Sequence, residues 1–282
     1  MPELPEVETV RRGIESRAVG RRILSVTVGR ERSVRRVGRE AVVRGLEGAT
    51  ITSTSRRGKY LLADLDTGDR MMIHLRMSGR VLVVPSGTER PPHTHVTMAL
   101  APRDGSAEEL LFVDPRTFGE VVVYDPREED AVLPELGRLG VDPIAEPFDG
   151  DVLWRALRGR RGAVKPLLLS QRVVAGIGNI YADEILHRCR MRWTRPGDRL
   201  SRRHVDELAA QTVAVLSEAI EAGGSTLEDT QYVDVDGNTG WFQVNHLVYG
   251  REGEGCLTCG RSTVRRVVVA GRSTSYCPRC QR

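Results

Sequence analysis

The first three residues, Met1, Pro2 and Glu3, could supply a nucleophile and a proton donor. Removal of the initiator methionine would expose Pro2 as a free secondary amine. An α-amino group has a pKa near ~8, so a neutral fraction exists at pH 7 and can attack an aldehyde-like carbon to form a Schiff base. Glu3 follows directly and could give or take protons. A Met-Pro start also occurs simply because the second residue is small, so the remaining sequence must decide.

Near the C-terminus, two C-x-x-C pairs flank residues 260–276, a spacing typical of zinc sites. Four thiolates complete a tetrahedral zinc site, which predicts one structural zinc ion without an open catalytic position. Two disulfides are the alternative, disfavoured because the chain shows no export signal. The expected ligands are Cys256, Cys259, Cys277 and Cys280, and the remaining Cys189 is expected to be a buried thiol.

Between the cysteine pairs, the pattern predicts a hairpin of two strands, Arg266–Ala270 and Ser273–Tyr276. Arg272 would lie at its tip, where a guanidinium can bind a phosphate.

Basic residues favour a polyanionic partner. Arginines cluster between Arg11 and Arg57 and between Arg155 and Arg172, although the net charge is only +4. Among 42 basic residues only Lys59 and Lys165 are lysines, which suggests that these two positions require a compact ammonium group. Chance retention explains them equally well.

The elements that position these residues indicate an α+β protein. Apolar residues at helical spacing predict an amphipathic helix over residues 4–18, and short β-rich runs from Ile23 to Tyr124 predict an antiparallel sandwich or barrel. Helical patterns follow at 151–158, 165–174, 179–187 and 201–222. We therefore expect an N-terminal β-sandwich domain (1–130), a linker (131–150), a helical domain (151–245) with a loop at 223–241, and a zinc finger (246–282).

Several functions are disfavoured by the sequence. There is no apolar run long enough to span a bilayer, so we expect no membrane partner and a cytoplasmic, nucleoid-associated location. The Gly176–Ala182 stretch superficially resembles a dinucleotide fingerprint but follows a helical pattern, so no nucleotide cofactor is expected. Two helices joined by a glycine turn, with Asn179 capping the second, would instead offer backbone N–H groups to a phosphate.

Several motifs, in this order and spacing, resemble formamidopyrimidine-DNA glycosylase over the whole chain. They are Pro2–Glu8, Arg57–Tyr60, His74–Gly79, Asp114–Gly119, Gly176–Glu184, Tyr249–Gly253 and the four-cysteine end. The resemblance implies a bifunctional enzyme that excises oxidised purines from double-stranded DNA and cleaves the abasic site, acting as a monomer.

The resemblance also implies catalytic roles. Pro2 matches the nucleophile, Glu3 the general acid, Glu6 a supporting carboxylate and Lys59 the essential lysine, while Arg272 is associated with the second elimination. Without the resemblance, Glu6 would be interpreted only as a first-turn charge that interacts favourably with the helix dipole, and Lys59 as a surface cation.

DNA contacts follow from the same resemblance. Met77, Arg116 and Phe118 match residues that fill the space left by a flipped nucleotide, although methionine and phenylalanine are more often core residues. Asn179 and Arg272 match a pair that binds the phosphate beside the lesion. The further expected DNA-binding residues are His93, Arg161, Lys165 and Tyr181.

The choice of the excised base depends on loop 223–241. By resemblance, a loop of this kind favours oxidised purines as substrates. Glu228, Asp229 and Thr230 depart from the sequences associated with this loop. One alternative is an endonuclease VIII-type enzyme for oxidised pyrimidines, which Leu4 and the long loop disfavour. The other is a non-catalytic DNA-binding zinc protein, which would bind DNA without cleaving it.

Overall fold

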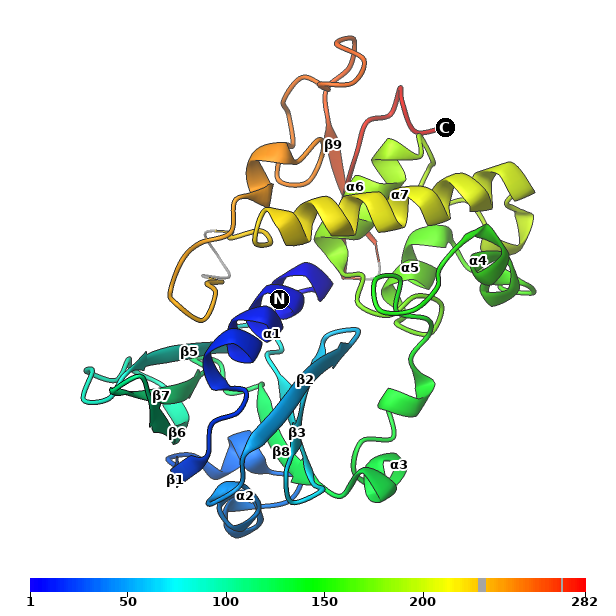
Figure 1. Cartoon of the computed structure of the whole chain (residues 1–282). Coiled ribbons are helices and arrows are strands. Elements are labelled where there is room, and N and C mark those ends of the chain that lie inside the picture. Colours follow the sequence, from blue (N-terminus) through cyan, green and yellow to red (C-terminus); the bar gives the residue numbers. More distant parts are fainter. Residues whose placement is uncertain (228–231, 270) are drawn as a thin grey trace. The chain divides into compact units, whose positions relative to one another are not determined.

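The computed structural model describes residues 1–227, 232–269 and 271–282 (Figure 1). Contacts divide the chain into two compact units. The first comprises residues 1–137 and 222–241, and the second comprises residues 138–221 and 242–282.

The first unit is built on an N-terminal helix and eight strands. Helix α1 spans Leu4–Ala18, as predicted. The strands are β1 (Ile23–Val28), β2 (Ile51–Arg57), β3 (Tyr60–Leu65), β4 (Arg70–His74), β5 (Arg80–Pro85), β6 (Thr94–Arg103), β7 (Ser106–Val113) and β8 (Glu120–Tyr124). Shorter helices are η1 (Glu31–Val34), α2 (Arg39–Leu46), η2 (Pro126–Glu128), α3 (Glu129–Val132) and η3 (Leu136–Arg138), the last at the unit boundary.

These strands form two four-stranded antiparallel sheets, ordered β1-β6-β7-β5 and β2-β3-β4-β8. Val7, Val10 and Ile14 lie on one face of α1 and are buried in the same apolar cluster as residues from both sheets. Burial of this face fixes the helix, and with it the start of the chain, on the sheets.

Strand β2 and the longest of the shorter helices, α2, were not predicted. Strand β2 has the sequence Ile-Thr-Ser-Thr-Ser-Arg-Arg and buries only Ile51, Thr54 and Arg56, so its apolar signal is weak. Helix α2 is short and buries only Val42 and Leu46. The β2 sequence lacks the apolar alternation of a strand, and α2, with 8 residues, is too short for its apolar face to be recognised.

The second unit is helical and carries the zinc-type hairpin. Its helices are α4 (Gly150–Leu157), α5 (Val164–Leu169), α6 (Asn179–Arg188), η4 (Gly197–Arg199), α7 (Arg202–Glu221) and η5 (Phe242–Asn245). Helix α5 is shorter than the predicted 165–174, because Gln171 adopts a positive φ of 60° that ends the helical path.

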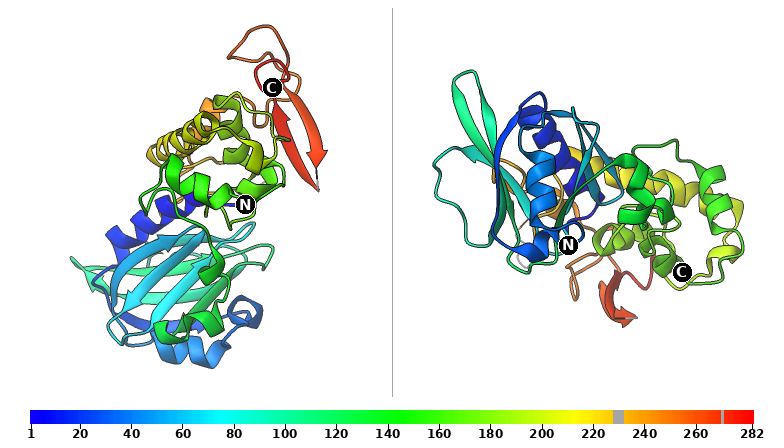
Figure 2. Two further views of the ribbon diagram at one scale, coloured as in Figure 1. Left: turned by 90° about the vertical axis from the view of Figure 1, so that its right-hand side faces the viewer. Right: turned by 90° about the horizontal axis from the view of Figure 1, so that it is seen from below.

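Strands β9 (Arg265–Val269) and β10 (Arg272–Tyr276) pair antiparallel and form the hairpin drawn in orange and red in Figure 2. Ala270, expected in the first strand, lies outside the described residues. Arg272 begins β10 opposite Val269, instead of lying in the turn.

The unit boundaries differ from those expected. Residues 138–150, predicted as linker, belong largely with the helices because Gly140 N–H donates to Gln171 O and Ala175 N–H donates to Val141 O. Loop 223–241, predicted within the helical domain, belongs to the first unit, since Val83 N–H donates to Val235 O and Val235 is buried in that core. Within the described ranges, no helix is both long and apolar enough to cross a membrane.

Candidate active site and nucleic-acid interface

The start of α1 orders Pro2 and two glutamates. Glu3 is the N-cap, and its backbone N–H donates to Glu6 Oε2 at 2.7 Å within a capping box. Such reciprocal capping satisfies helix-end donors and fixes both carboxylates. Pro2, Glu3 and Glu6 are all buried. The predicted nucleophile and acid therefore stand on a rigid helix end.

Glu6 also binds the loop formed by residues 222–241. Its Oε1 accepts a hydrogen bond from Ser225 N–H at 2.8 Å, and its carbonyl oxygen accepts one from the Tyr232 hydroxyl at 3.3 Å. Burial and the nearby Glu6 raise the pKa of Tyr232, so its hydroxyl stays protonated and available as a donor. The loop predicted to select the base is thus anchored beside the predicted catalytic residues.

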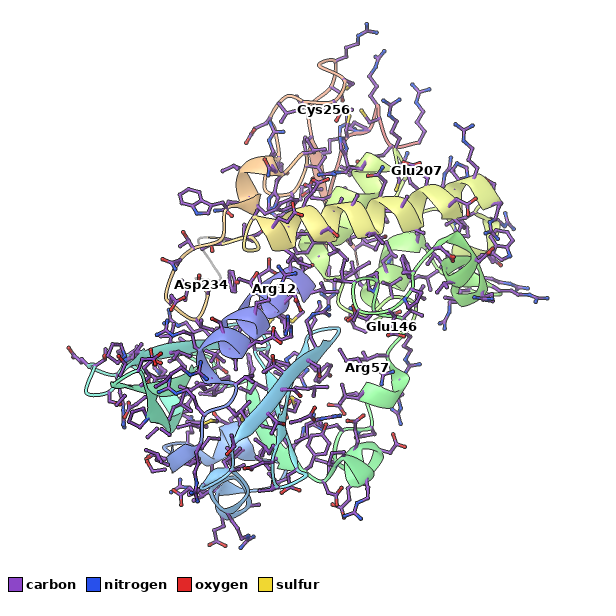
Figure 3. The ribbon with its side chains drawn as sticks, viewed as in Figure 1. Arg12, Arg57, Glu146, Glu207, Asp234 and Cys256 are labelled. Atoms are coloured by element: carbon purple, nitrogen blue, oxygen red, sulfur yellow. The ribbon has the colours of Figure 1, made fainter. Side chains whose placement is uncertain are left out.

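The same loop is braced internally. Thr226 Oγ1 donates to Tyr232 O and accepts from Gly240 N–H, both at 2.8 Å, while Asp234 Oδ1 accepts from Asn238 N–H at 2.8 Å. Figure 3 labels Asp234 on this loop. Glu228, Asp229 and Thr230, the positions expected to depart from the resemblance, lie outside the described residues.

Lys59 lies in the turn between β2 and β3 and is buried. The preceding Gly58 has a positive φ of 58°, which a glycine adopts without strain. Arg56 braces this turn by donating to Gly58 O at 2.9 Å, and its Nε lies 3.2 Å from Glu8 Oε2 on α1. Helix α1 and the lysine turn are therefore coupled through one buried ion pair.

Met77, Arg116 and Phe118 are brought together on the first unit. Met77 is 37% exposed and Phe118 is 41% exposed, which is high for large apolar side chains. The Arg116 guanidinium carbon lies 5.2 Å from the centre of the Phe118 ring, within cation–π range. Two exposed apolar side chains and a stacked arginine suit insertion into a base stack.

His93 lies beside this group. It has a φ of 68°, and its carbonyl oxygen accepts a hydrogen bond from Asp114 N–H at 3.0 Å. The exposed His93 ring is thus held next to the strand end that leads to Arg116.

The second unit brings Asn179 and Arg272 together. Asn179 Nδ2 donates to the hydroxyl of Ser273, the residue after Arg272, at 3.1 Å. Asn179 Oδ1 has no hydrogen-bond partner among the described residues. Because the Ser273 hydroxyl can donate or accept, a turned amide would keep this contact.

Asn179 does not cap its helix as expected. Gly178 is the N-cap of α6, and Asn179 is the first helical residue. Glycine is accepted at N-caps, and it leaves the asparagine side chain available for the hairpin.

Two predicted DNA contacts of this unit are corrected. Lys165 is buried, and its ammonium group binds Asp183 Oδ1 at 2.6 Å, Ser273 O at 2.7 Å and Thr274 Oγ1 at 3.0 Å. These partners make it a brace between α5, α6 and β10. Tyr181 is fully buried, with its ring centre 5.8 Å from that of Phe242, so its ring belongs to the core. Arg161 has a 93% exposed side chain and stays a candidate phosphate contact.

The four predicted ligand cysteines converge at the other end of the hairpin. Their sulfur atoms all lie within 4.8 Å of one another, with Cys256–Cys280 and Cys259–Cys277 separations of 3.8 Å. Zn–S bonds of ~2.3 Å in a tetrahedron place sulfur atoms ~3.8 Å apart, so the donor set fits zinc. Gln281 Oε1 accepts from Cys277 N–H at 2.9 Å and braces one ligand. The predicted structural zinc site is confirmed.

Cys189 stands apart from this group. It is half-buried, and burial raises the pKa of its thiol to about 12. It therefore stays protonated and unreactive.

Sequence reasoning missed residues that position these groups. Asp114 and Ser78 lie within quoted motifs, but only the structure joins them, by a hydrogen bond of 2.6 Å. Glu184 accepts three backbone N–H groups, from Leu247, Val248 and Tyr249. An aspartate before proline, as in Asp114-Pro115, is the one local signal of turn chemistry that could have indicated Asp114.

Three family models match the chain. The formamidopyrimidine-DNA glycosylase N-terminal domain matches residues 1–121, the formamidopyrimidine-DNA glycosylase H2TH domain matches residues 139–231, and the zinc finger found in FPG and IleRS matches residues 253–282.

Similar proteins agree over full length. A formamidopyrimidine-DNA glycosylase of Syntrophotalea carbinolica is 43% identical, and one of Corynebacterium jeikeium is 42% identical, each covering 100% of both chains. Among solved structures, a Lactococcus lactis FPG mutant in complex with a Fapy-dG containing DNA is 36% identical with a TM-score of 0.89 and full coverage. MutM in complex with carbocyclic 8-oxo-G containing DNA is 35% identical with a TM-score of 0.88 and full coverage.

The fold and the cysteine site define a zinc-finger protein of the H2TH class, with an N-terminal helix and antiparallel sheets. The predicted α+β fold is confirmed. The chain belongs to the formamidopyrimidine-DNA glycosylase family.

Proposed function

We propose that this protein is a bifunctional DNA glycosylase and abasic-site lyase that removes oxidised purines, such as 8-oxoguanine and formamidopyrimidines, from double-stranded DNA. The relatives bound to Fapy-dG and 8-oxo-G DNA support this substrate class. We expect it to act as a monomer in the cytoplasm, on the nucleoid, without a nucleotide cofactor.

One observation carries the proposal: the buried Pro2 directly precedes the capped start of α1, where Glu3 and Glu6 are buried and Glu6 also anchors the 222–241 loop. A free proline nitrogen there would be fixed in position, which lowers the entropic part of the barrier. Methionine removal is required, because only then is the lone pair of the nitrogen free for attack and no longer delocalised into a peptide bond.

The chemistry follows from this amine. The Pro2 nitrogen attacks C1′ of the damaged nucleotide and gives up its proton, while the bond from C1′ to the base breaks and the base leaves protonated. The C1′–O4′ bond of the sugar then opens, and Glu3 supplies the proton to O4′, which leaves an iminium between Pro2 and C1′. The resulting iminium acidifies the neighbouring sugar protons, so successive β- and δ-eliminations break the two flanking phosphate bonds. Hydrolysis of the iminium then restores the free amine. Glu6 supports this site, and Lys59 supplies a positive charge near the leaving group and phosphate.

The damaged nucleotide must leave the duplex before Pro2 can reach it. Extrusion costs a few kcal/mol of lost stacking and pairing. Met77 and Phe118 fill the resulting space, while Arg116 hydrogen-bonds the unpaired partner base.

Phosphate contacts hold the damaged strand. We assign Asn179, Arg161, Arg272 and His93 to this role, and Arg272 to the second elimination as well. The zinc ion closes the cysteine end of the hairpin and thereby keeps β9 and β10 folded.

Borohydride trapping tests the proposal. The protein is incubated with a duplex carrying 8-oxoguanine opposite cytosine, with a thymine glycol duplex and an undamaged duplex as comparisons. An adduct on Pro2 with the purine lesion supports the proposed chemistry and substrate. An adduct mainly on thymine glycol would favour an endonuclease VIII-type activity, and binding without any adduct would favour a non-catalytic DNA-binding protein.

A further inference from the structure

Ser78 connects the turn that carries Met77 to the loop that carries Arg116 and Phe118. The Ser78 hydroxyl donates to Asp114 Oδ1 at 2.6 Å and accepts from Arg116 N–H at 3.2 Å. Ser78 directly follows Met77, so one hydroxyl joins the two segments beside their exposed side chains.

Asp114 is the centre of this network. It is fully buried, and Oδ1 also lies 3.3 Å from Arg116 N while Oδ2 accepts from Gly119 N–H at 2.7 Å. The carboxylate thus holds both ends of the Arg116–Phe118 loop. The backbone carbonyl oxygen of Asp114 lies 2.8 Å from His95 Nε2, and this contact fixes the end of β7 from the other side.

The Met77 turn is also held on its other side. Arg76 Nη2 donates to Glu120 Oε1 at 2.7 Å, and Arg76 N–H donates to His74 Nδ1 at 2.9 Å. Glu120 is fully buried at the start of β8, just beyond the Arg116–Phe118 loop. Two buried carboxylates of one segment therefore bind the residues before and after Met77.

The backbone at Arg76 and Thr117 is strained, and these contacts stabilise it. Arg76 has a φ of 54° and Thr117 a φ of 57°, values that cost energy for residues other than glycine. Strained conformations persist only where surrounding contacts determine them. Here those contacts are hydrogen bonds to Asp114 and Glu120, which fix where Met77, Arg116 and Phe118 point.

We propose that Ser78 and Asp114 are positioning residues, which lock Met77 to Arg116 and Phe118 so that the three side chains enter the DNA as one preorganised wedge. This inference rests on the proposed function. The wedge is ready before DNA arrives, so lesion extrusion does not have to order two separate loops.

Single-turnover kinetics of Ser78→Ala test this. The substrates are an 8-oxoguanine duplex, which requires extrusion of a stacked base, and a preformed abasic duplex. A hydrogen bond to a charged group is worth enough for roughly a tenfold effect, so we expect 8-oxoguanine excision to slow roughly tenfold. Abasic-site cleavage should change less than about twofold, because no stacked base has to be expelled.

Three further variants sharpen the test. Ser78→Thr keeps the hydroxyl and should restore 8-oxoguanine excision. Ser106→Ala removes an exposed hydroxyl at the start of β7 and should change neither substrate. Adding Ser78→Ala to Met77→Ala should cause a smaller loss than Ser78→Ala causes alone, because part of the serine's effect passes through the methionine.

The outcomes separate the two hypotheses. If the wild-type protein gives no Pro2 adduct and cleaves neither duplex, the proposed function fails. If the wild type is active but Ser78→Ala slows both substrates equally, or neither, the positioning role is overturned. Additive losses in the double variant would overturn it as well, and melting temperatures identify a variant that is merely unfolded.

Discussion

Glu6 and Ser225, far apart in the sequence, are joined by a hydrogen bond of 2.8 Å from the serine N–H to the glutamate Oε1. The other carboxylate oxygen, Oε2, accepts from Glu3 N–H at 2.7 Å. One buried carboxylate therefore fixes both the start of α1 and the loop proposed to select the base. A disturbance of the loop should reach the catalytic residues through Glu6.

Gly224→Ala should report this coupling. Gly224 has a φ of 82°, and a Cβ there would lie 2.8 Å from Glu6 Oε1. The left-handed backbone alone costs an alanine about 1–2 kcal/mol, and the close contact adds to that. We expect a lower melting temperature and slower 8-oxoguanine excision.

Gly237→Ala is the matched control. Gly237 lies in the same loop with a φ of 87°, but a Cβ there would meet nothing within 4 Å. It carries the backbone cost without the contact to Glu6. Equal losses of activity in the two variants would contradict coupling through Glu6.

Pro2→Gly should separate chemistry from binding. The variant keeps a terminal amine but changes its basicity and its rigid geometry, so turnover should fall at least about tenfold. Affinity for a lesion duplex, measured by fluorescence anisotropy, should stay within about twofold, because the phosphate contacts are unchanged.

Pro5→Gly provides the comparison. Pro5 lies in the first turn of the same helix but would not carry the terminal amine. It should lower stability without abolishing the borohydride adduct. Loss of binding in Pro2→Gly, with turnover retained, would mark Pro2 as structural.

Removal of zinc should weaken DNA binding through Arg272. Without the metal, the four cysteines at the other end of the hairpin are no longer joined, and the arginine at the start of β10 is no longer held. We expect a chelator to weaken affinity about tenfold or more, the size of one lost charged contact. Hydrogen exchange of α1 amides should stay unchanged.

Arg272→Ala should reproduce most of this loss in the zinc-loaded protein. Arg265→Ala is its control, because Arg265 is also exposed on the hairpin but pairs with Tyr276, away from Val269 and the turn. Equal losses for both arginines would indicate a general charge effect, and unchanged affinity in metal-free protein would refute the role of the hairpin.

Strong local patterns made much of the fold predictable. Helix α1 was predictable, with its end near Ala18, because Leu4, Val7, Val10 and Ile14 form one apolar face. The four cysteines were equally clear, since metal-ligand spacing is a local property. Strand β2 escaped because most of its residues are polar.

The site was predictable only where motifs carried it. Pro2, Glu3 and Met77 could be named from the resemblance, but nothing local shows that Ser78 binds Asp114. Lys165 was assigned to DNA because the resemblance places it close to DNA-contacting positions, whereas the fold surrounds it with Asp183 and the hairpin. Such pairings depend on tertiary contacts, which a single sequence does not display.

Acidification should destabilise the first unit through His74. Burial, assisted by the nearby Arg76, lowers the pKa of His74 to about 3 from 6.5. In the unfolded chain the histidine takes up a proton below pH ~6.5, whereas in the folded protein it stays neutral until about pH 3. Stability is therefore full at pH 7 and falls as the pH decreases through this window.

Protonation of Glu120 also destabilises the first unit, but at lower pH. Burial opposes its ionisation, but hydrogen bonds from Arg36 and Arg76 prevail and lower its pKa to about 2 from 4.5. Its contribution is thus present above pH ~4.5 and is lost towards pH 2. Between pH 7 and pH 5, His74 accounts for the larger part, about 2 kcal/mol.

Hydrogen exchange of β3, β4 and β8 amides at pH 7 and pH 5, corrected for intrinsic rates, measures this loss in the first unit alone. His74→Gln cannot take up a proton, and its loss should be smaller than that of the wild type by about 2 kcal/mol. His204→Gln, in the second unit, should behave like the wild type. An unchanged pH dependence in His74→Gln would show that His74 is not the group that destabilises the sheet on acidification.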